Sequence, residues 1–409
     1  MEEQEKSIRE IYMNDTKNLI PVAVALVKKL DIKLYNGVLY FKCGTKYIND
    51  NNKLLREISK HIQLKSTQLN EIISQIRIYG ELIENSDFKL CVRNGVLSNY
   101  TIENIDYGFT PFYLDVTYKP NAYDENVDTF LNFICKDRND MRLVIEELIG
   151  HILLINRFPH KLFFITGSGA NGKSTFLEML NNFIGDLASH IDIRSFDDGT
   201  CVASLVGKLV NIADDIDPLW IDKSKNLKTL ASGNTISVRP VYAYPIDVKN
   251  TATLIFTTNE PPTFKDKSKG ITRRLVIIPF ENKVHEINYN LDNLLSTDNA
   301  KSYLLNLALK GIERIYNNHW QLSNSETIAN ATNDYYIERD NILAYLNAFP
   351  DIINKPINEV YKDYSIYTER NGNHVYSINK FSRRLSDLGY HSVTTNINGT
   401  SVKVIKVKD

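Results

Sequence analysis

Apolar and polar positions between residues 162 and 285 form short apolar runs separated by longer helical patterns. The apolar runs predict strands at 162–166, 208–213, 236–244, 252–258 and 274–280. Strands that alternate with helices indicate an α/β fold with a mostly parallel sheet. Upstream, the apolar positions from 127 to 153 follow a helical period and predict two helices that lead into the first strand.

Shorter elements precede this region. Asn36-Gly37 and Asn94-Gly95 each lie between two apolar runs, which predicts two β-hairpins. A helical period covers most of residues 53–87. We therefore expect an N-terminal α+β domain, which we place at 1–120 and interpret as a possible collar.

The remaining chain divides into two further domains. A helical period covers 300–345, and after residue 350 two short helices precede two β-rich arms between 391 and 407. We expect the P-loop domain at 121–325 and a C-terminal domain at 326–409.

Composition narrows the function classes. The 409 residues hold 48 Lys and Arg against 49 Asp and Glu, so a nucleic-acid partner must be held by local basic patches. The four cysteines form no CxxC pair, which argues against a zinc site or a disulfide framework. The first residues, MEEQEKSIREIY, contain no signal-peptide core, and no apolar run reaches the roughly 18 residues of a membrane span. We expect no membrane partner.

The stretch GSGANGKST fits the phosphate-binding pattern G-x-x-x-x-G-K-[ST]. It lies between an apolar strand and an amphipathic helix, as this motif requires. Backbone N–H groups of such a loop surround the β-phosphate, the lysine reaches the β- and γ-phosphates, and the serine hydroxyl ligates Mg²⁺. We assign ATP and Mg²⁺ to this loop, through Gly167, Ser168, Gly169, Ala170, Asn171, Gly172, Lys173, Ser174 and Thr175.

Two later strands end in polar residues suited to hydrolysis. Leu209–Ala213 leads into Asp214-Asp215, of which we assign Asp214 to the metal and Asp215 to the catalytic base, with the reverse order left open. The strand near 253–258 ends at Asn259, which is placed to contact the γ-phosphate or the attacking water.

Paired arginines precede the last strand of the region. Arg273 and Arg274 lie in Gly-Ile-Thr-Arg-Arg, just before the run that starts at Leu275. A guanidinium that reaches a neighbouring subunit's γ-phosphate contributes about 10³–10⁵ to the rate of a nucleotide hydrolase. We favour Arg274 for this catalytic role, with Arg273 second.

In order, these residues occur in GSGANGKST, LVNIADD, LKTLASGN, TATLIFTTNEPP and ITRRLVIIPF. Together they resemble the superfamily 3 helicases, and more narrowly the helicase part of the phage/plasmid and poxvirus primase-helicase family, over about residues 30–285. The resemblance implies an AAA+ fold, a homo-hexameric ring, ATP hydrolysis at subunit boundaries and 3′-to-5′ translocation on single-stranded DNA. It also implies a replication protein of a mobile genetic element, such as a phage, plasmid or genomic island, in the cytoplasm of a bacterial host.

The chain departs from the family at the DNA-gripping motif. Relatives usually have Thr-Gly-Gly-Asp after the lysine that Lys228 matches, whereas residues 231–234 are Ala-Ser-Gly-Asn. The following hairpin would project into the ring channel, and its candidate contacts to single-stranded DNA are Arg239, Tyr242, Tyr244 and Lys249. Residues 1–120 contain no acidic motif of a primase, so we expect no primer synthesis.

The C-terminal pattern predicts a winged helix with a basic surface. Residues 378–389 form a short amphipathic helix, followed by the arms around Asn398-Gly399. A helix of this kind enters the major groove while the wing contacts phosphates, which suggests a replication initiator bound to duplex origin DNA. The candidate contacts are Lys380, Arg383, Arg384, Lys403 and Lys406.

Two other functions remain open from the sequence. The first is a P-loop ATPase that remodels protein partners without unwinding DNA. The second is an initiator that binds DNA while its P-loop has only a structural role.

Overall fold

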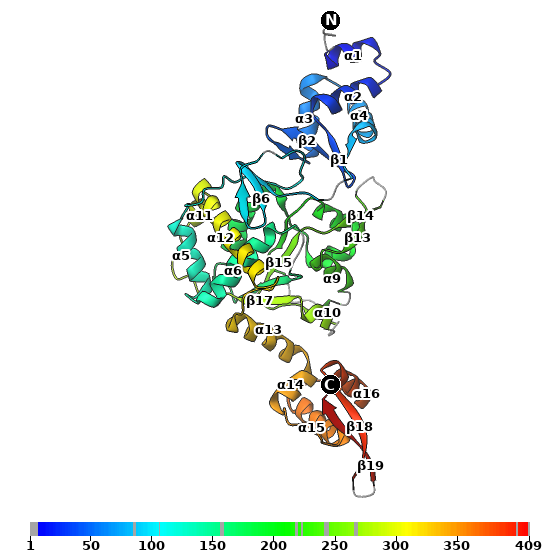
Figure 1. Cartoon of the computed structure of the whole chain (residues 1–409). Helices are drawn as coiled ribbons and strands as arrows, with labels where there is room; N and C mark the ends of the chain where they lie inside the picture. The colour runs from blue at the N-terminus through cyan, green and yellow to red at the C-terminus, as the bar shows by residue number, and fades with distance from the viewer. Residues whose placement is uncertain are drawn as a thin grey trace.

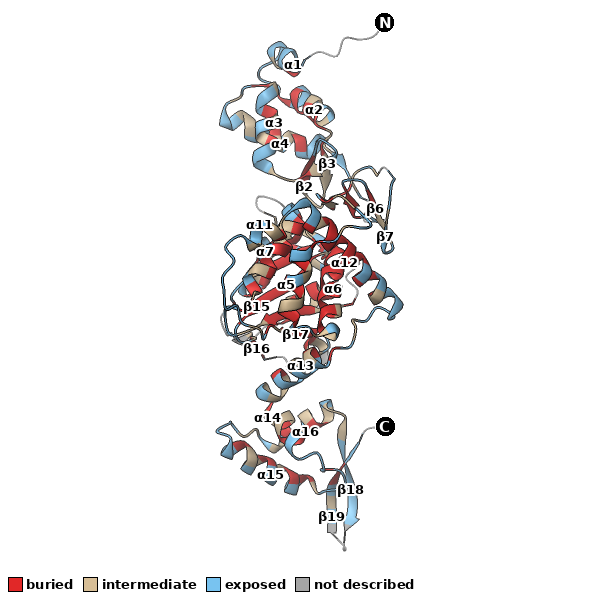
Figure 2. Ribbon diagram, turned by 90° about the vertical axis from the view of Figure 1, so that its left-hand side faces the viewer, coloured by how far each residue is buried: buried red, intermediate tan, exposed pale blue. Residues whose placement is uncertain are grey.

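The computed structural model describes residues 7–84, 87–105, 107–155, 159–216, 220–221, 224–240, 245–265, 269–397 and 400–407. The molecule is elongated, with the N-terminal unit at one end, a large central α/β unit, and the C-terminal unit at the other end (Figure 1). Each unit has its own cluster of buried residues, and the ribbon in Figure 2 is red where residues are buried.

The N-terminal unit is a layer of helices packed on a small sheet. The predicted hairpin at Asn36-Gly37 is confirmed, since Tyr35 pairs with Val38 across that turn. The elements are α1 (Ile8–Asn14), α2 (Ile20–Lys29), β1 (Lys33–Tyr35), β2 (Val38–Cys43), β3 (Lys46–Ile48), α3 (Asn51–His61), α4 (Ser66–Tyr79) and β4 (Glu81–Leu82).

A second small sheet follows, with the order β7-β6-β5-β8. Its strands are β5 (Cys91–Val92), β6 (Gly95–Ser98), β7 (Thr101–Glu103) and β8 (Tyr113–Leu114). The predicted hairpin exists, but its turn is displaced by one residue. Val92 pairs with Gly95, so the loop is Arg93-Asn94 and the glycine lies in the strand. The Asn94 side chain fixes this loop through hydrogen bonds of 2.8 and 2.9 Å to the backbone of Tyr118.

The central unit is built on a parallel sheet with the order β10-β11-β15-β9-β17. Its strands are β10 (Ala188–Ser189), β11 (Val210–Ala213), β15 (Thr253–Thr258), β9 (Leu162–Thr166) and β17 (Leu275–Pro279). The predicted parallel α/β layer is therefore confirmed. Because β9 pairs in register with β15 and β17, the carboxyl ends of these neighbouring strands meet at one edge of the sheet.

Helices cover both faces of this sheet, since its strands are apolar on both sides. Phe163 and Ile165 of β9 belong to one buried cluster, while Leu162 and Phe164 belong to a second. The first cluster lies beneath α5 (Glu125–Cys135), α6 (Asn139–Leu153), α7 (Lys173–Ile184), α11 (Leu291–Leu295) and α12 (Asp298–Asn317). The second contains residues of α8 (Gly199–Val202), α9 (Lys225–Ala231), α10 (Lys269–Thr272) and α13 (Glu326–Arg339).

Smaller elements complete the central unit. The channel-hairpin prediction corresponds to the antiparallel pair β13 and β14. The remaining elements are β12 (Trp220–Ile221), β13 (Thr235–Val238), β14 (Ile246–Lys249), β16 (Thr263–Phe264) and the 3₁₀ turns at Gly185–Leu187, Ile193–Asp197 and Ala203–Leu205.

α6 and α12 cross with their backbones almost in contact. A Cβ atom on Gly311 would lie 2.3 Å from the carbonyl oxygen of Glu146, and one on Gly150 would lie 2.6 Å from that of Ala308. Only glycine permits this approach. α12 spans 20 residues, yet among the described residues no helix combines the length and apolar character needed to cross a membrane.

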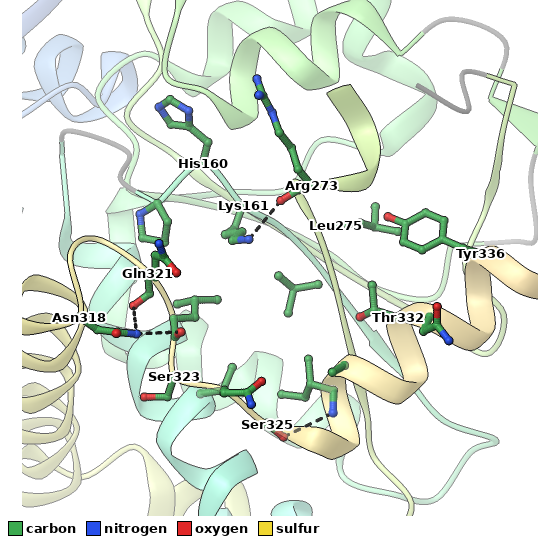
Figure 3. Close-up of a pocket in the computed structure, with 18 residues that line it drawn as sticks. His160, Lys161, Arg273, Leu275, Asn318, Gln321, Ser323, Ser325, Thr332 and Tyr336 are labelled. Carbon is green, nitrogen blue, oxygen red and sulfur yellow. Dashed lines mark hydrogen bonds between the residues drawn. The ribbon is translucent and has the colours of Figure 1, made fainter. Parts of the chain in front are cut away.

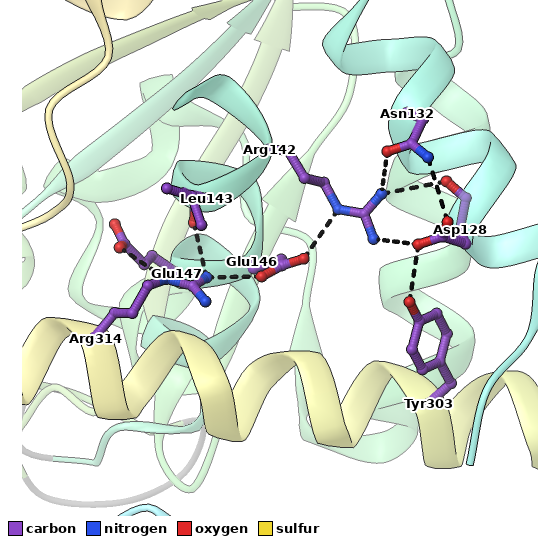
Figure 4. Close-up of polar contacts among 8 residues, drawn as sticks. All are labelled: Asp128, Asn132, Arg142, Leu143, Glu146, Glu147, Tyr303 and Arg314. Carbon is purple, nitrogen blue, oxygen red and sulfur yellow. Dashed lines mark hydrogen bonds and ion pairs between the residues drawn. The ribbon is translucent and has the colours of Figure 1, made fainter. Parts of the chain in front are cut away.

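A polar network ties α5, α6 and α12 together beside this crossing (Figure 4). Arg142 donates to Asp128 at 2.8 Å and to Glu146 at 3.0 Å. The Tyr303 hydroxyl also donates to Asp128 at 2.8 Å, and Arg314 donates to Glu146 at 2.8 Å. The mostly buried charges are thus paired and hydrogen-bonded, which is the condition under which burial is tolerated.

The C-terminal unit contains three helices and a two-stranded hairpin. Its own cluster brings together Tyr345, Tyr364 and Phe381, one from each helix. The elements are α14 (Asn341–Ala348), α15 (Ile357–Arg370), α16 (Ile378–Asp387), β18 (Tyr390–Ile397) and β19 (Thr400–Val407). The predicted hairpin turn, Asn398-Gly399, lies outside the described residues.

The buried clusters show which core each end of the central unit joins. The N-terminal cluster ends at Ile76, and residues from Phe88 onward already belong to the central core. At the other end, Tyr335 of α13 packs with the sheet, while the C-terminal cluster begins at Ile342.

Candidate functional site

The loop 167–172 connects β9 to α7 at the carboxyl edge of the sheet. Its backbone is left-handed at Gly169, Ala170 and Gly172, with φ of 92°, 49° and 87°. A Cβ atom on Gly167 would lie 1.8 Å from Nδ2 of Asn171, so only glycine fits there. α7 then begins at Lys173 and directs its positive end at the loop, which is the arrangement that binds phosphate.

The Lys173 ammonium lies at the centre of this loop. Its Nζ donates to the carbonyl oxygen of Gly167 at 2.5 Å, to Oδ1 of Asn171 at 3.2 Å and to Oδ1 of Asn259 at 3.5 Å. Burial lowers the pKa of Lys173, and the nearby Asp214 and Asp215 oppose this shift. The structure therefore brings together the predicted lysine, the predicted Asn259 and the two acids.

Asn171 fixes the loop to the sheet. Its side chain is 3% exposed, and Nδ2 donates to the carbonyl oxygen of Phe280 at 3.0 Å, just beyond β17. The same side chain accepts from Lys173 through Oδ1. Asn171 therefore orients the ammonium as well as the loop.

The two acids follow β11, next to the loop. Asp214 accepts from the Thr257 hydroxyl and from the Asp215 backbone N–H at 2.9 Å. Asp215 has a left-handed backbone, with φ of 48°, and its N–H also contacts Oγ1 of Thr257 at 3.0 Å. This tight turn exposes both carboxylates at the edge of the sheet.

A cleft of about 680 Å³ opens beside the acids, lined by Ser174, Thr175 and Asp214 among others. Hydroxyl and carboxylate oxygens are the ligands that Mg²⁺ prefers, and the cation keeps several waters when few protein ligands contact it. Ser174 and Asp214 thus fit the predicted magnesium site. Within the described residues no cluster of three or more His, Cys, Asp or Glu forms a ready metal cage.

The same cleft contains residues that the sequence did not single out. Its wall includes Glu178, His190, Asp192 and Asp292. His190 and Asp192 follow β10, whose two residues are too few for the apolar pattern to identify as a strand. The pairing of β10 with β11 brings the end of β10 to the same sheet edge as the two acids. The sequence pattern does not reveal this pairing.

The two predicted catalytic arginines lie in different surroundings. Arg274 is 8% exposed, and its Nε and Nη2 donate to Oγ of Ser232 at 2.9 and 2.6 Å. Its Nη1 donates to the carbonyl oxygen of Gly270. A guanidinium held in this way faces its own protomer, which favours Arg273, our second candidate, over Arg274 as the group that reaches a neighbour.

Arg273 is exposed and lines a basin of about 1030 Å³ at the amino ends of β9 and β17 (Figure 3). Lys161 and His160 share this basin, and Nζ of Lys161 donates to the carbonyl oxygen of Arg273 at 3.1 Å. Burial lowers the pKa of Lys161. The basin therefore presents basic groups on the sheet edge opposite the phosphate loop.

The predicted single-stranded DNA contacts are only partly described. Arg239 is exposed just after β13. Lys249 is exposed at the other end of the hairpin, opposite Thr235. Lys228 is half-buried on α9. Tyr242 and Tyr244 lie outside the described residues.

The predicted duplex contacts of the C-terminal unit also differ among themselves. Lys380 and Arg383 are exposed on α16, and Lys403 and Lys406 are exposed on β19. Nζ of Lys380 lies 3.3 Å from the centroid of the Tyr376 ring. Arg384 instead donates to Asp340 at 2.7 Å, so its guanidinium is partly occupied within the protein.

Comparison with known proteins gives three findings. Residues 165–274 match a family of unknown function, DUF5906. The chain is 32% identical over 183 residues to a protein of Acanthamoeba polyphaga mimivirus that bears the name putative helicase. That match covers 42% of this chain and 19% of the relative.

The fold is similar to solved structures of the NrS-1 C-terminal region. One apo structure has a TM-score of 0.55 at 15% identity and covers 99% of this chain and 100% of that one. A second has a TM-score of 0.52 at 16% identity, with coverages of 94% and 99%. At this identity the similarity concerns the fold alone. The central unit is thus an α/β layer with a phosphate-type loop, and 42% of the chain is similar in sequence to a viral protein named as a helicase.

Proposed function

We propose that this chain is an ATP-dependent DNA helicase of the superfamily 3 type with an AAA+ core, which initiates replication of a mobile genetic element. The observation that carries the proposal is the convergence of Lys173, Asn259 and Asp214 at the carboxyl edge of one parallel sheet. The viral relative named as a helicase supports the choice of motor.

Each group at this edge has a role in hydrolysis. The loop amides and Lys173 hold the β- and γ-phosphates, and bound Mg²⁺ neutralises charge that develops on their oxygens. Ser174 and Asp214 hold the cation. Asp215 takes the proton of the attacking water, and Asn259 orients that water against the γ-phosphate.

In a ring of subunits, the neighbouring protomer supplies the positively charged arginine that the site still needs. The acidic cleft contains Glu178, Asp192 and Asp292, whereas the lining of the opposite basin includes Lys161 and Arg273. Surfaces of opposite charge on opposite edges favour head-to-tail contacts, which form a ring when the rotation between neighbouring subunits closes. In the proposed homo-hexamer, Arg273 reaches the nucleotide of the next protomer.

DNA contacts belong to two other surfaces. Arg239 and Lys249, at the two described ends of the β13–β14 hairpin, grip single-stranded DNA in the channel during 3′-to-5′ translocation. The C-terminal unit acts as a winged helix, with α16 in the major groove and β18–β19 as the wing. Its exposed Lys380, Arg383 and Lys403 are the proposed contacts to duplex origin DNA.

A strand-displacement assay tests the motor. Purified chain with ATP and Mg²⁺ is expected to unwind 3′-tailed but not 5′-tailed duplexes, and to elute as a hexamer. Lys173→Ala should abolish both hydrolysis and unwinding. Hydrolysis that neither responds to DNA nor separates strands would favour an ATPase that remodels protein, and absence of hydrolysis would overturn the motor.

A further inference from the structure

α13 is fastened to the edge strand of the central sheet. The Thr332 hydroxyl accepts a hydrogen bond from the Ile277 N–H of β17 at 3.2 Å. One turn further, the Tyr336 hydroxyl donates to the carbonyl oxygen of Thr272 at 2.9 Å. Both bonds reach the backbone, so they fix the position of α13 on the core.

The same helix also holds the loop that carries Asn259. Glu260, Pro261 and Pro262 follow this residue, and the Thr258 hydroxyl bonds to both the N–H and the carbonyl oxygen of Glu260. The prolines have no N–H, so their backbone can be fastened only through its carbonyl oxygens. The Tyr335 hydroxyl donates to the carbonyl oxygen of Pro262 at 2.5 Å. Nη2 of Arg339 donates to that of Pro261 at 3.1 Å.

These two donors support each other. The guanidinium carbon of Arg339 lies 4.5 Å from the centroid of the Tyr335 ring, within the range of a cation–π contact. Tyr335 is 6% exposed, and burial raises its pKa to about 12, so the hydroxyl keeps its proton. The loop therefore has a donor that does not change with working pH.

The far end of α13 is fixed as well. Asp340 directly follows the helix and is 4% exposed. Its Oδ1 accepts from the N–H of Ile342 at 3.2 Å, at the start of α14, and its Oδ2 accepts from Nε of Arg384 at 2.7 Å. α13 is thus anchored at the core and at the C-terminal unit, with the Asn259 loop held between these anchors.

We propose that Tyr335 and Arg339 are positioning residues that fix the distance between Asn259 and the γ-phosphate of bound ATP. The proposal rests on the function given above, in which Asn259 orients the attacking water. Asn259 is exposed, and its Oδ1 lies 3.5 Å from Nζ of Lys173. The Thr258 hydroxyl bonds to Glu260 on the far side of Asn259, and the carbonyls of the two prolines are the further groups through which α13 holds this loop.

The first test is Tyr335→Phe, which removes one hydroxyl and keeps the ring. We expect kcat for ATP hydrolysis to fall about fivefold while ATP affinity stays within about twofold, because one positioning hydrogen bond is lost and the phosphate loop is untouched. Tyr361→Phe is the matched control. Its hydroxyl donates to the carbonyl oxygen of Tyr376 at 2.9 Å, away from the site, so kcat should not change.

A double variant separates positioning from general stability. In an Asn259→Ala background the residue to be positioned is gone, so Tyr335→Phe should cause no further loss of kcat. An equal further loss in that background would overturn the proposal, because the tyrosine would then act on stability or elsewhere.

A measurement that needs no hydrolysis keeps the two proposals distinguishable. Hydrogen exchange at the amides of Asn259, Glu260 and Thr263 should quicken in Tyr335→Phe and stay unchanged in Tyr361→Phe. If the chain hydrolyses no ATP but this exchange quickens, the helicase proposal fails while the hold on the loop stands. Unchanged hydrogen exchange in Tyr335→Phe would show that Tyr335 does not fix the Asn259 loop, and would overturn this inference.

Discussion

Lys173 links the proton balance of the protein to nucleotide binding. Burial lowers its pKa below the ordinary 10.5 in the free protein, whereas a bound polyphosphate favours the charged form and raises it again. As pH rises through the lowered pKa, Lys173 of the free protein loses the proton that ATP binding needs. ATP affinity should therefore fall toward alkaline pH, with proton uptake on binding.

Calorimetry in buffers of different ionisation enthalpy measures this uptake. Lys173→Arg is the control, since its guanidinium stays protonated throughout the range. Binding of ATP to the wild-type chain without proton uptake at alkaline pH would contradict the linkage.

The two acids should separate by their kinetics. Asp214→Asn is expected to raise the Mg²⁺ concentration needed for half-maximal hydrolysis by about tenfold or more, because a charged ligand is lost from the cation. Asp215→Asn should leave that concentration unchanged and lower kcat by about 10²–10⁴, the usual contribution of a positioned base. A magnesium titration of hydrolysis in both variants decides the assignment, and the opposite pattern would exchange the two roles.

The sequence predicted the residues that follow a recognisable strand and missed those that do not. Lys173, Asp214 and Asn259 meet because each follows a long apolar run, and parallel strands bring such ends together. His190 and Asp192 follow a two-residue strand that leaves no apolar pattern. The inward direction of Arg274 depends on Ser232, 42 positions earlier, and no local pattern encodes that contact.

At the scale of elements, the crossing of α6 and α12 should be sensitive to a single methyl group. Gly311→Ala places a Cβ atom 2.3 Å from the carbonyl oxygen of Glu146, so the helices must separate. We expect a loss of about 1–3 kcal/mol in the free energy of unfolding, typical of an overpacked core. Urea denaturation followed by circular dichroism measures it.

Gly108→Ala is the matched control for this helix crossing. A Cβ atom there meets nothing within 4 Å, so stability should hardly change. Equal stability of the two variants would mean that the helices relax at no cost, against the tight contact in the structure.

The elements themselves were mostly predictable, because apolar periodicity is a local property. The strands near 162–166 and 252–258 and the helices of 127–153 appear where the pattern placed them. The turn near residue 94 was displaced because Asn94 bonds to Tyr118, a contact distant in sequence. Domain boundaries depend on which core each segment joins, and no local pattern encodes that choice.

The whole molecule is elongated, and α13 is the helix that joins its central unit to the C-terminal unit (Figure 1). The core of the central unit extends from Phe88 to Tyr335, so a truncation before residue 326 would remove a helix that covers the sheet. A truncation after Arg339 keeps that helix. It is therefore the better variant for separating hydrolysis from duplex binding.

If neighbouring subunits of a ring share each nucleotide site, two inactive variants should complement each other in mixed rings. Lys173→Ala subunits lack the lysine that binds the phosphates but keep Arg273, whereas Arg273→Ala subunits have the converse defect. Each variant alone should be inactive, yet random mixed rings should regain about one quarter of wild-type ATPase, because about one quarter of head-to-tail boundaries then join two intact halves. Arg274 contacts Ser232 of its own protomer, so a mixture of Arg274→Ala and Lys173→Ala subunits should show no activity above the average of the two variants measured alone. Refolded mixtures, sized to verify mixed rings and assayed for phosphate release, distinguish the cases. Inactive mixed rings of the first pair would show that Arg273 does not complete its neighbour's site, and recovery by the second pair would return that role to Arg274.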